Sequence, residues 1–196
     1  MISKDRFVSA AILGFSLAAF AAKFPSPTAA ADSFQQKVEH IQANAKQPEP
    51  DPKPTHFSQE EINAYFSERR LPKMPEGVKS VRFELSPENV TAYTTVDFDE
   101  LRRERNTKNP LLALFTGQHD VVVVAHTEPT TPGHVRVRVE SVEIDGISVP
   151  KMALELFIDR FVKPKYPNVG LDEEYKLPAR IASALIKQEL GVIAQK

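Results

Sequence analysis

HDVVVVAHTEPTTPGHVRVRVESVEIDGI, residues 119–147, is the stretch that decides the fold. Residues 119–128 predict a strand whose centre is apolar on both faces, and residues 129–133 turn the chain. Residues 134–144 alternate apolar and polar side chains, which is typical of a half-buried strand. The stretch therefore predicts two long antiparallel strands of a sheet.

The alternation changes parity inside the second of these strands. Valines occupy positions 135, 137 and 139, whereas the next apolar residues are Val142 and Ile144. One extra residue near Ser141 would restore the register, so we predict a β-bulge that also bends the strand. Asp145-Gly146 between Ile144 and Ile147 is a strong signal for a two-residue hairpin turn.

The flanking sequence adds further antiparallel elements. Residues 81–85 and 90–98 predict a hairpin, and residues 99–105 predict one or two helical turns. Residues 179–190 would suit a helix by propensity, but Pro178 and Gly191 bracket a segment that also reads as a hairpin. We favour the hairpin, because a sheet is already expected.

Two segments carry more apolar side chains than a surface helix needs. LLALF, residues 111–115, is apolar throughout, and residues 150–163 are apolar except for a narrow polar stripe. A surface helix requires an apolar stripe only about 100° wide. Either these segments are sandwiched in the core, or part of their surface lines a groove for an apolar ligand. The sequence supports both interpretations equally.

FSQEEINAYF, residues 57–66, predicts a short helix with a defined start. Ser58 and Glu61 have the spacing of a capping box, and Ile62, Tyr65 and Phe66 share one face. We expect this face to cover an end or edge of the sheet, since exposed sheet edges need such cover. The side chain of Asn63 could then bond the backbone of the adjoining strand.

The N-terminus predicts export. Basic residues precede the apolar run 7–22, and Ala29-Ala30-Ala31 offers a small-residue cleavage site. We expect residues 1–31 to be a signal peptide cleaved near Ala31, with retention as a membrane anchor as the alternative. The chain has no cysteine, so the leader is not that of a diacyl lipoprotein, and thiol chemistry is excluded.

Residues 32–54 are expected to form a weak surface helix and a proline-rich linker. Phe34, Val38 and Ile41 have helical spacing, and a proline occupies every second position of 48–54. A single α+β domain is then expected over residues 55–196. The formal net charge is −1 without a clustered basic stripe, which argues against nucleic acid as a partner.

No catalytic or metal-binding motif is evident. Asp97, Asp99 and Glu100 could suit acid–base chemistry, but they fit the first turn of a helix more simply. His126 and His134 flank a turn and could face each other, but a third metal ligand is not evident. We therefore expect no enzyme, no metal and no cofactor.

The opening helix SQEEINAYF and the order of elements after it resemble exported bacterial domains of the tubular lipid-binding (TULIP-like) group, including periplasmic lipid-binding proteins of envelope mannan synthesis. The resemblance covers residues 57–196. It implies an α+β fold in which a curved antiparallel sheet wraps one long apolar helix, with a short N-terminal covering helix and a groove for acyl chains. The covering face would be Ile62, Tyr65 and Phe66. The groove candidates are Leu111, Leu114, Phe115, Phe157 and Phe161.

We therefore expect a non-catalytic, exported cell-envelope protein that binds a lipid or another apolar small molecule, with peripheral membrane contact. The alternative is a periplasmic scaffold with a fully packed core that binds an envelope protein. A hydrolase ranks third, because no nucleophile–base pair is evident.

Overall fold

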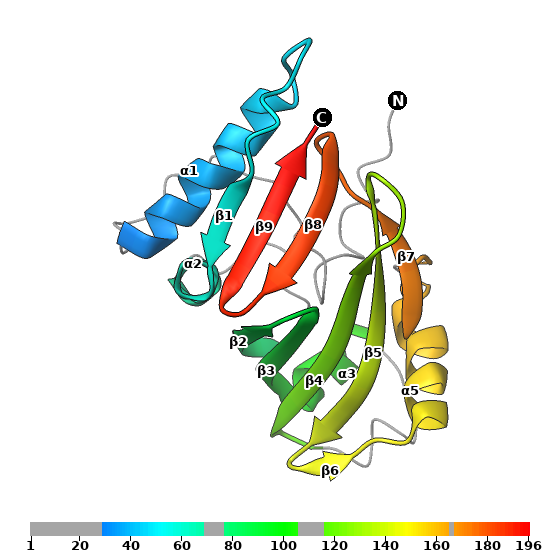
Figure 1. Ribbon diagram of the computed structural model, residues 1–196. Helices are drawn as coiled ribbons and strands as arrows, with labels where there is room; N and C mark the ends of the chain where they lie inside the picture. The colour runs from blue at the N-terminus through cyan, green and yellow to red at the C-terminus, as the bar shows by residue number, and fades with distance from the viewer. Residues whose placement is uncertain (1–28, 69–76, 106–115, 165–166) are drawn as a thin grey trace.

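The computed structural model describes residues 29–68, 77–105, 116–164 and 167–196, which form an α+β fold with two antiparallel sheets (Figure 1). The helices in these ranges are α1 (Ala29–Asn44), α2 (Gln59–Glu68), α3 (Phe98–Arg105) and α5 (Lys151–Phe157). The strands are β1 (Thr55–Ser58), β2 (Val78–Ser86), β3 (Asn89–Asp97), β4 (Gln118–Pro129), β5 (His134–Ile144), β6 (Ile147–Ser148), β7 (Asp172–Lys176), β8 (Ile181–Lys187) and β9 (Leu190–Gln195).

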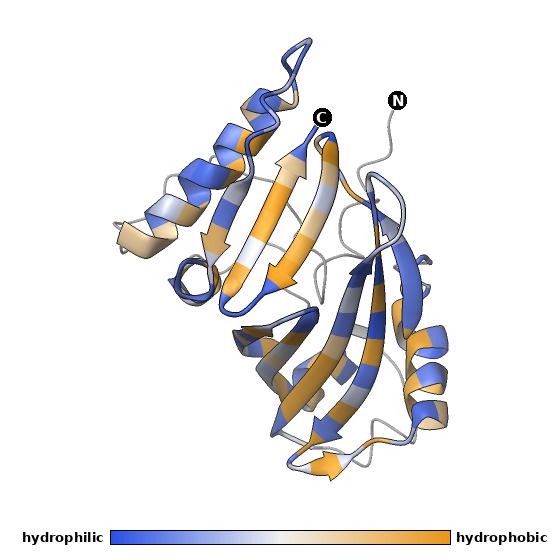
Figure 2. Cartoon of the chain, in the orientation of Figure 1, coloured by the Kyte–Doolittle hydropathy of each residue, from blue (hydrophilic) through white to orange (hydrophobic). Residues whose placement is uncertain are grey.

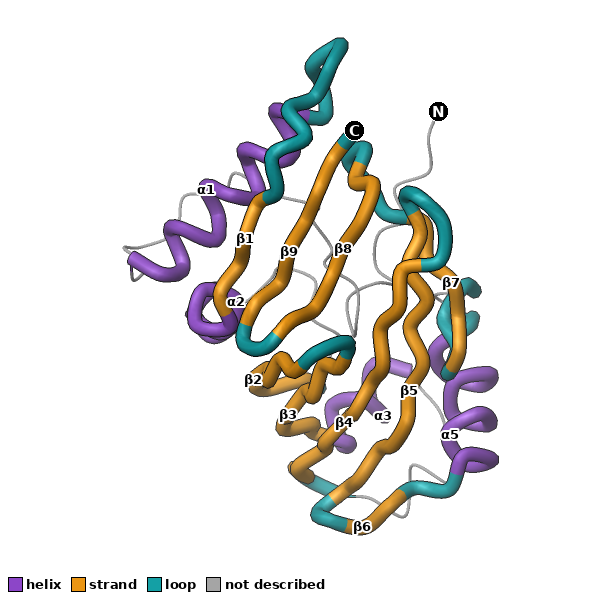
Figure 3. The backbone as a smooth tube through the Cα atoms, viewed as in Figure 1, coloured by secondary structure: helices purple, strands orange, loops and turns teal. Residues whose placement is uncertain are grey.

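The larger sheet has the strand order β2-β3-β4-β5-β6, and β7 also pairs with β5. Its β4–β5 pair is the one that the opening stretch predicts. The register passes from Val124 opposite Ser141 to Ala125 opposite Val139, so Glu140 is the extra residue of a bulge. The predicted bulge is confirmed, and β5 bends along its length in Figure 3. The predicted hairpin turn at Asp145-Gly146 is also confirmed, because Ile144 pairs with Ile147.

The smaller sheet has the order β1-β9-β8, and it settles the ambiguous C-terminal segment. Residues 181–187 and 190–195 are strands β8 and β9 of one hairpin, so the favoured hairpin is confirmed. Glu189 occupies the turn with a φ of 53°. The chain returns beside β1, the strand that precedes α2, so the first and last strands of the described fold pair in one sheet.

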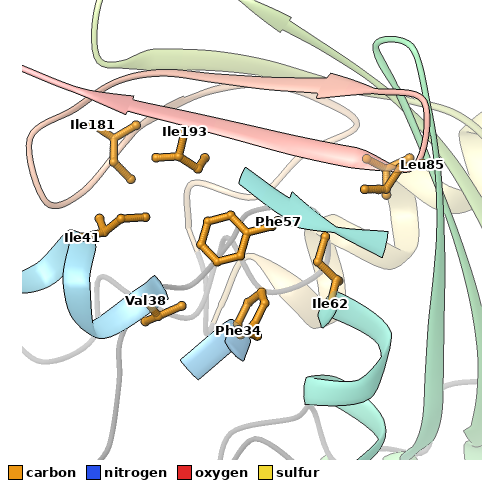
Figure 4. Close-up of a cluster of buried hydrophobic side chains, with 9 residues drawn as sticks. Phe34, Val38, Ile41, Phe57, Ile62, Leu85, Ile181 and Ile193 are labelled. Atoms are coloured by element: carbon orange, nitrogen blue, oxygen red, sulfur yellow. The ribbon is translucent and has the colours of Figure 1, made fainter. Parts of the chain in front are cut away.

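Helix α1 belongs to the main core. The expectation of a weak surface helix is wrong, because Phe34, Val38 and Ile41 are buried against Phe57 of β1 and Ile193 of β9. In Figure 4, Phe57 lies at the centre of this cluster, between side chains of α1 and of the sheet. The apolar spacing was visible in the sequence, but the surface that it covers is formed by a strand at the far end of the chain. Burial of this stripe therefore depends on tertiary contacts rather than on helix propensity.

Helix α2 links the two sheets, and its predicted features are confirmed. The Ser58 amide donates to Glu61 Oε2 over 2.8 Å, and the Glu61 amide donates to Ser58 Oγ over 3.1 Å, which completes the capping box. The side chain of Asn63 bonds the backbone of Phe83 on β2, the edge strand of the larger sheet. Side chains of α2 thus cover the edge that the sequence predicts them to cover.

The described residues contain no long apolar helix wrapped by a sheet, so that expectation is not met. The segment 150–163 is helical, but it consists of the seven-residue α5 followed by a π-helical segment, Ile158–Val162. None of the side chains of α5 is fully buried, and the helix lies beside the larger sheet in Figure 1. Part of its excess of apolar residues faces solvent, because Met152 and Leu156 are 78% and 42% exposed.

Within the described ranges, no helix has the length and hydropathy needed to cross a membrane. The apolar run 7–22 lies outside those ranges, whereas Ala29–Ala31 form the first turn of α1.

Candidate functional site

The predicted groove residues divide into three groups. Leu111, Leu114 and Phe115 lie outside the described residues. Phe161 lies in the π-helical segment, and its side chain is outside the described part of the structure. Phe157 is half-buried and packs in a cluster around Phe98. The structure therefore places one of the five candidate side chains.

The cluster around Phe98 joins two helices to the larger sheet. Phe98 is 6% exposed at the start of α3, and Phe157 reaches the cluster from α5. The strand residues of the cluster are Val96, Val121 and Ile144, and Leu101 completes it from α3. Because these strand residues share one face by register, α3 and α5 both lie over that face.

The other predicted face, that of the covering helix, packs against the main core. Ile62 is a member of the main core cluster, and Tyr65 and Phe66 pack against it. The ring of Phe66 lies edge-on to Phe83 with centroids 5.0 Å apart, and Tyr65 lies 4.4 Å from Phe34. These three side chains hold α2 between α1 and β2, so their role is structural.

Between the main core and the cluster around Phe98 lies a set of mostly apolar side chains from two adjacent cross-strand rows, which we call the central apolar face. Register places them together: Val81 opposes Thr94, Ala92 opposes Val123, and Val123 opposes Val142. Ala92 is buried, and the other four are only half-buried. The face consists of Val81, Ala92, Thr94, Val123 and Val142, and none of them carries a charge.

Thr94 is the polar exception on this face. Its Oγ1 is buried and has no hydrogen-bond partner among the described residues. Its cross-strand neighbours are Val81 and Val121, which offer only hydrocarbon. A buried hydroxyl in such surroundings is uncommon, because buried polar groups are nearly always paired.

The opposite face of the sheet is polar and internally paired. Arg82 Nη1 donates to Glu84 Oε1 over 2.6 Å, and the Tyr93 hydroxyl donates to Glu84 Oε2 over 2.9 Å. These two hydrogen bonds lower the pKa of Glu84, and the bond from Arg82 contributes most. The guanidinium of Arg82 also lies over the Tyr93 ring, 4.2 Å from its centroid. Along β5 in Figure 2, hydrophilic and hydrophobic bands alternate as this two-faced arrangement requires.

A histidine–carboxylate pair joins the start of β4 to the β5–β6 turn. His119 Nδ1 lies 2.5 Å from Asp145 Oδ2, and the Asp120 amide donates to Asp145 Oδ1 over 3.0 Å. The hydrogen bond to Asp145 raises the pKa of His119 above its ordinary value, and the same bond lowers the pKa of Asp145. Asp145 has a φ of 50°, so the pair also secures a turn with left-handed backbone.

The carboxylates at 97–100 form a helix start, as the simpler interpretation predicted. Asp97 Oδ1 accepts the Glu100 amide over 2.9 Å, which makes Asp97 the N-cap of α3. This hydrogen bond is the main cause of the lowered pKa of Asp97. Lys79 lies 2.5 Å from Glu100 and 3.8 Å from Asp97, so the group is balanced by a cation. An ionised, capped carboxylate is a poor general acid at neutral pH.

His126 and His134 do not face each other. His126 pairs in register with Arg138, and His134 pairs with Lys176. Their nearest polar contacts are to Asn89 and Thr131. In the parts of the chain that the structure describes, no group of three or more histidine, aspartate or glutamate side chains could hold a metal ion.

Sequence reasoning missed the central apolar face, because it sought a groove on helices. The sequence indicated an apolar sheet face in two places: residues 81–85 alternate apolar and polar side chains, and the strand 119–128 is apolar on both faces at its centre. What the sequence could not supply was the pairing of strands, which places Val81, Thr94 and Val123 on one surface. Comparison of the chain with protein-family models, with curated proteins and with solved structures found no match.

Proposed function

We propose that this protein is an exported cell-envelope protein that binds the acyl chain of a lipid on the central apolar face, without catalysis. The observation that carries the proposal is a set of half-buried valines between two packed clusters. Val123 and Val142 oppose each other on strands β4 and β5, and Val81 lies on the same face of β2 in the adjacent cross-strand row, yet none of the three is fully buried. A protein interior normally closes over such a row, since burial of each valine side chain contributes roughly 1.5–3 kcal/mol.

The chemistry of the face favours a hydrocarbon occupant. Its five side chains are three valines, an alanine and a threonine, whereas the charges of these strands lie on the opposite face. A charged or strongly polar ligand would lose hydration there without ionic compensation. An acyl chain matches a long strip of aliphatic side chains and requires no polar partner along most of its length.

The proposal retains the resemblance to the TULIP-like group. Supporting it are the covering helix, the antiparallel hairpins and the bulged, bending β5 strand. The short α5 departs from the expected long helix, so we place the acyl chain on the sheet face beside α3 and α5. In this arrangement Phe157 would border the ligand, because it packs against Phe98 in the cluster that also contains Val121, next to the central apolar face.

A second candidate function, a scaffold that binds an envelope protein, is favoured by a different surface. Ile147 in β6 and Met152 in α5 are 73% and 78% exposed, and Leu156 follows one turn after Met152. Exposed apolar side chains at one corner of a domain suit a protein or membrane contact. This surface does not compete with the central apolar face, so the two functions predict different sensitive residues.

The test compares two neighbouring valines that point to opposite faces of β4. Val123→Gln alters the central apolar face, and Val122→Gln is the matched control on the polar face. Binding of dansyl-labelled undecanoic acid is measured by fluorescence, and folding is checked by circular dichroism. We expect Val123→Gln to weaken binding about tenfold and Val122→Gln to change it by less than about threefold. Equal binding by both variants, or no saturable binding by the wild-type protein, would contradict the proposal.

A further inference from the structure

The hydroxyl of Thr94 is the feature that the proposed function leaves unexplained. Its Oγ1 is buried on the central apolar face and has no partner among the described residues. The directly opposed side chains are Val81 on one side and Val121 on the other. A hydroxyl can donate one hydrogen bond and accept two, so all of this capacity is unused by the described protein groups.

Thr127 shows what the same residue type does elsewhere on the sheet. It lies on the same face of β4 as Val123 and Ala125, because it follows them by four and two residues in an alternating strand. Its Oγ1 donates to the carbonyl oxygen of Glu88 over 3.2 Å. Among the described residues, the sheet therefore pairs the hydroxyl of Thr127 on this face and gives no partner to the hydroxyl of Thr94 at its centre.

Valine would serve the fold better at position 94. It has nearly the shape of threonine, suits a β-strand equally well, and would not bury an unpaired polar atom. Burying a hydroxyl without a partner opposes folding, whereas satisfying it adds a favourable hydrogen bond. A ligand that brings an oxygen to this position would gain that bond in surroundings of low polarity, where hydrogen bonds are strong.

We propose that Thr94 is the polar recognition residue of the lipid site. Its hydroxyl would bond an oxygen carried on the acyl chain, such as a chain hydroxyl or an ester carbonyl. The inference rests on the proposed function, because it assigns the ligand class of the same face. Binding sites of this kind are mostly apolar with a few placed polar groups that fix the orientation of the ligand.

The experiment measures selectivity with two probes of equal chain length. Stearic acid and 12-hydroxystearic acid compete with dansyl-labelled undecanoic acid on the full chain, and each gives an inhibition constant. The variants are Thr94→Val, which removes the hydroxyl, and Thr94→Ser, which keeps it. Thr91→Val is the matched control, because Thr91 lies on the same strand but faces the polar side.

We expect the wild-type protein to prefer 12-hydroxystearic acid by about three- to tenfold, the effect of one net hydrogen bond. Thr94→Val should abolish this preference while stearic acid binds within about twofold of wild type. Thr94→Ser and Thr91→Val should keep the preference. Thr94→Val should also shift the urea midpoint of the ligand-free protein upward, because an unpaired buried hydroxyl is removed.

The outcomes separate this inference from the proposed function. If both fatty acids bind the wild-type protein and Thr94→Val leaves their ratio unchanged, the role of Thr94 is overturned and the lipid site stands. If neither fatty acid displaces the dansyl probe from the folded wild-type protein, the proposed function itself fails. A preference that Thr91→Val abolishes as strongly as Thr94→Val would also overturn the assignment.

Discussion

Asn63 forms two hydrogen bonds with the main chain of Phe83. Its Nδ2 donates to the Phe83 carbonyl oxygen over 2.8 Å, and the Phe83 amide donates to its Oδ1 over 2.7 Å. This is the donor–acceptor pair that a neighbouring strand would present to β2. Gln59 extends the arrangement, because its Oε1 accepts the Leu85 amide over 2.6 Å. A helix thus occupies the sheet edge and satisfies backbone groups that would otherwise be open to another chain.

Removal of the Asn63 side chain should destabilise the protein and expose this edge. We expect Asn63→Ala to lower the free energy of unfolding by roughly 1–3 kcal/mol, because a donor and an acceptor of β2 lose their partners. Urea titration gives the stability, and light scattering reports self-association. Glu60→Ala is the control, since Glu60 is an exposed residue of the same helix. Equal stability of the two variants would show that the Asn63 pair contributes nothing.

Two phenylalanines of the core should differ in their cost of truncation. Phe57 is fully buried, whereas Phe66 is half-buried against Phe83 and Tyr65. We expect Phe57→Ala to destabilise the protein by roughly 3–5 kcal/mol, and Phe66→Ala by roughly 2–3 kcal/mol because its site retains solvent contact. Urea melts measure both losses. A loss below about 1 kcal/mol for Phe66→Ala would show that this ring contributes little to the core.

Glu61 should couple the docking of α1 to pH. Burial raises the pKa of Glu61, but hydrogen bonds from Lys37, Ser33 and the Ser58 amide outweigh it, so the pKa is lowered overall. The associated stability is therefore present above the ordinary glutamate pKa and is lost as the pH falls through the lowered value.

Glu61→Gln removes the charge that Lys37 contacts at 2.5 Å and weakens the capping box. We expect a loss of about 1–2 kcal/mol at pH 7. The difference from wild type should shrink as the pH is lowered below the glutamate range, which urea melts at several pH values would detect. A difference that stays constant with pH would contradict the assigned role of the carboxylate.

The His119–Asp145 pair should titrate above the usual histidine range. Because the hydrogen bond that His119 donates to Asp145 raises the pKa of His119, the interaction is fully present at pH values below the ordinary histidine pKa and is lost as the pH rises through the raised value. NMR titration of the His119 ring measures this pKa directly. Asp145→Asn should bring it back toward the ordinary value, and an unchanged pKa in that variant would contradict the pairing.

Local features of the fold were readable from sequence because each depends on near neighbours. The capping box at Ser58 and Glu61, the bulge near Ser141 and the turn at Asp145-Gly146 all follow from spacing within a few residues. The hydrogen bonds of Asn63 were also predicted, because the helix was expected to cover a sheet edge and so to place this side chain beside an adjoining strand.

Features that depend on distant partners were missed. The burial of α1 requires Ile193, which lies more than 150 residues away, and nothing local distinguishes its stripe from that of a surface helix. In the sequence, Thr94 has no feature that distinguishes it from other strand residues, because only the strand register places it between Val81 and Val121. Likewise, the apolar excess of α5 predicted a buried or ligand-lining helix, whereas Met152 is largely exposed.

Native mass spectrometry of the protein purified from a host that exports it tests the central claim most directly, when combined with organic extraction of bound material. The account predicts a stoichiometric lipid on the wild-type protein and on Val122→Gln, and its loss from folded Val123→Gln. A ligand-free mass for the wild-type protein, unchanged after incubation with membrane lipids, would contradict lipid binding on the central apolar face and leave the protein-binding scaffold as the better account.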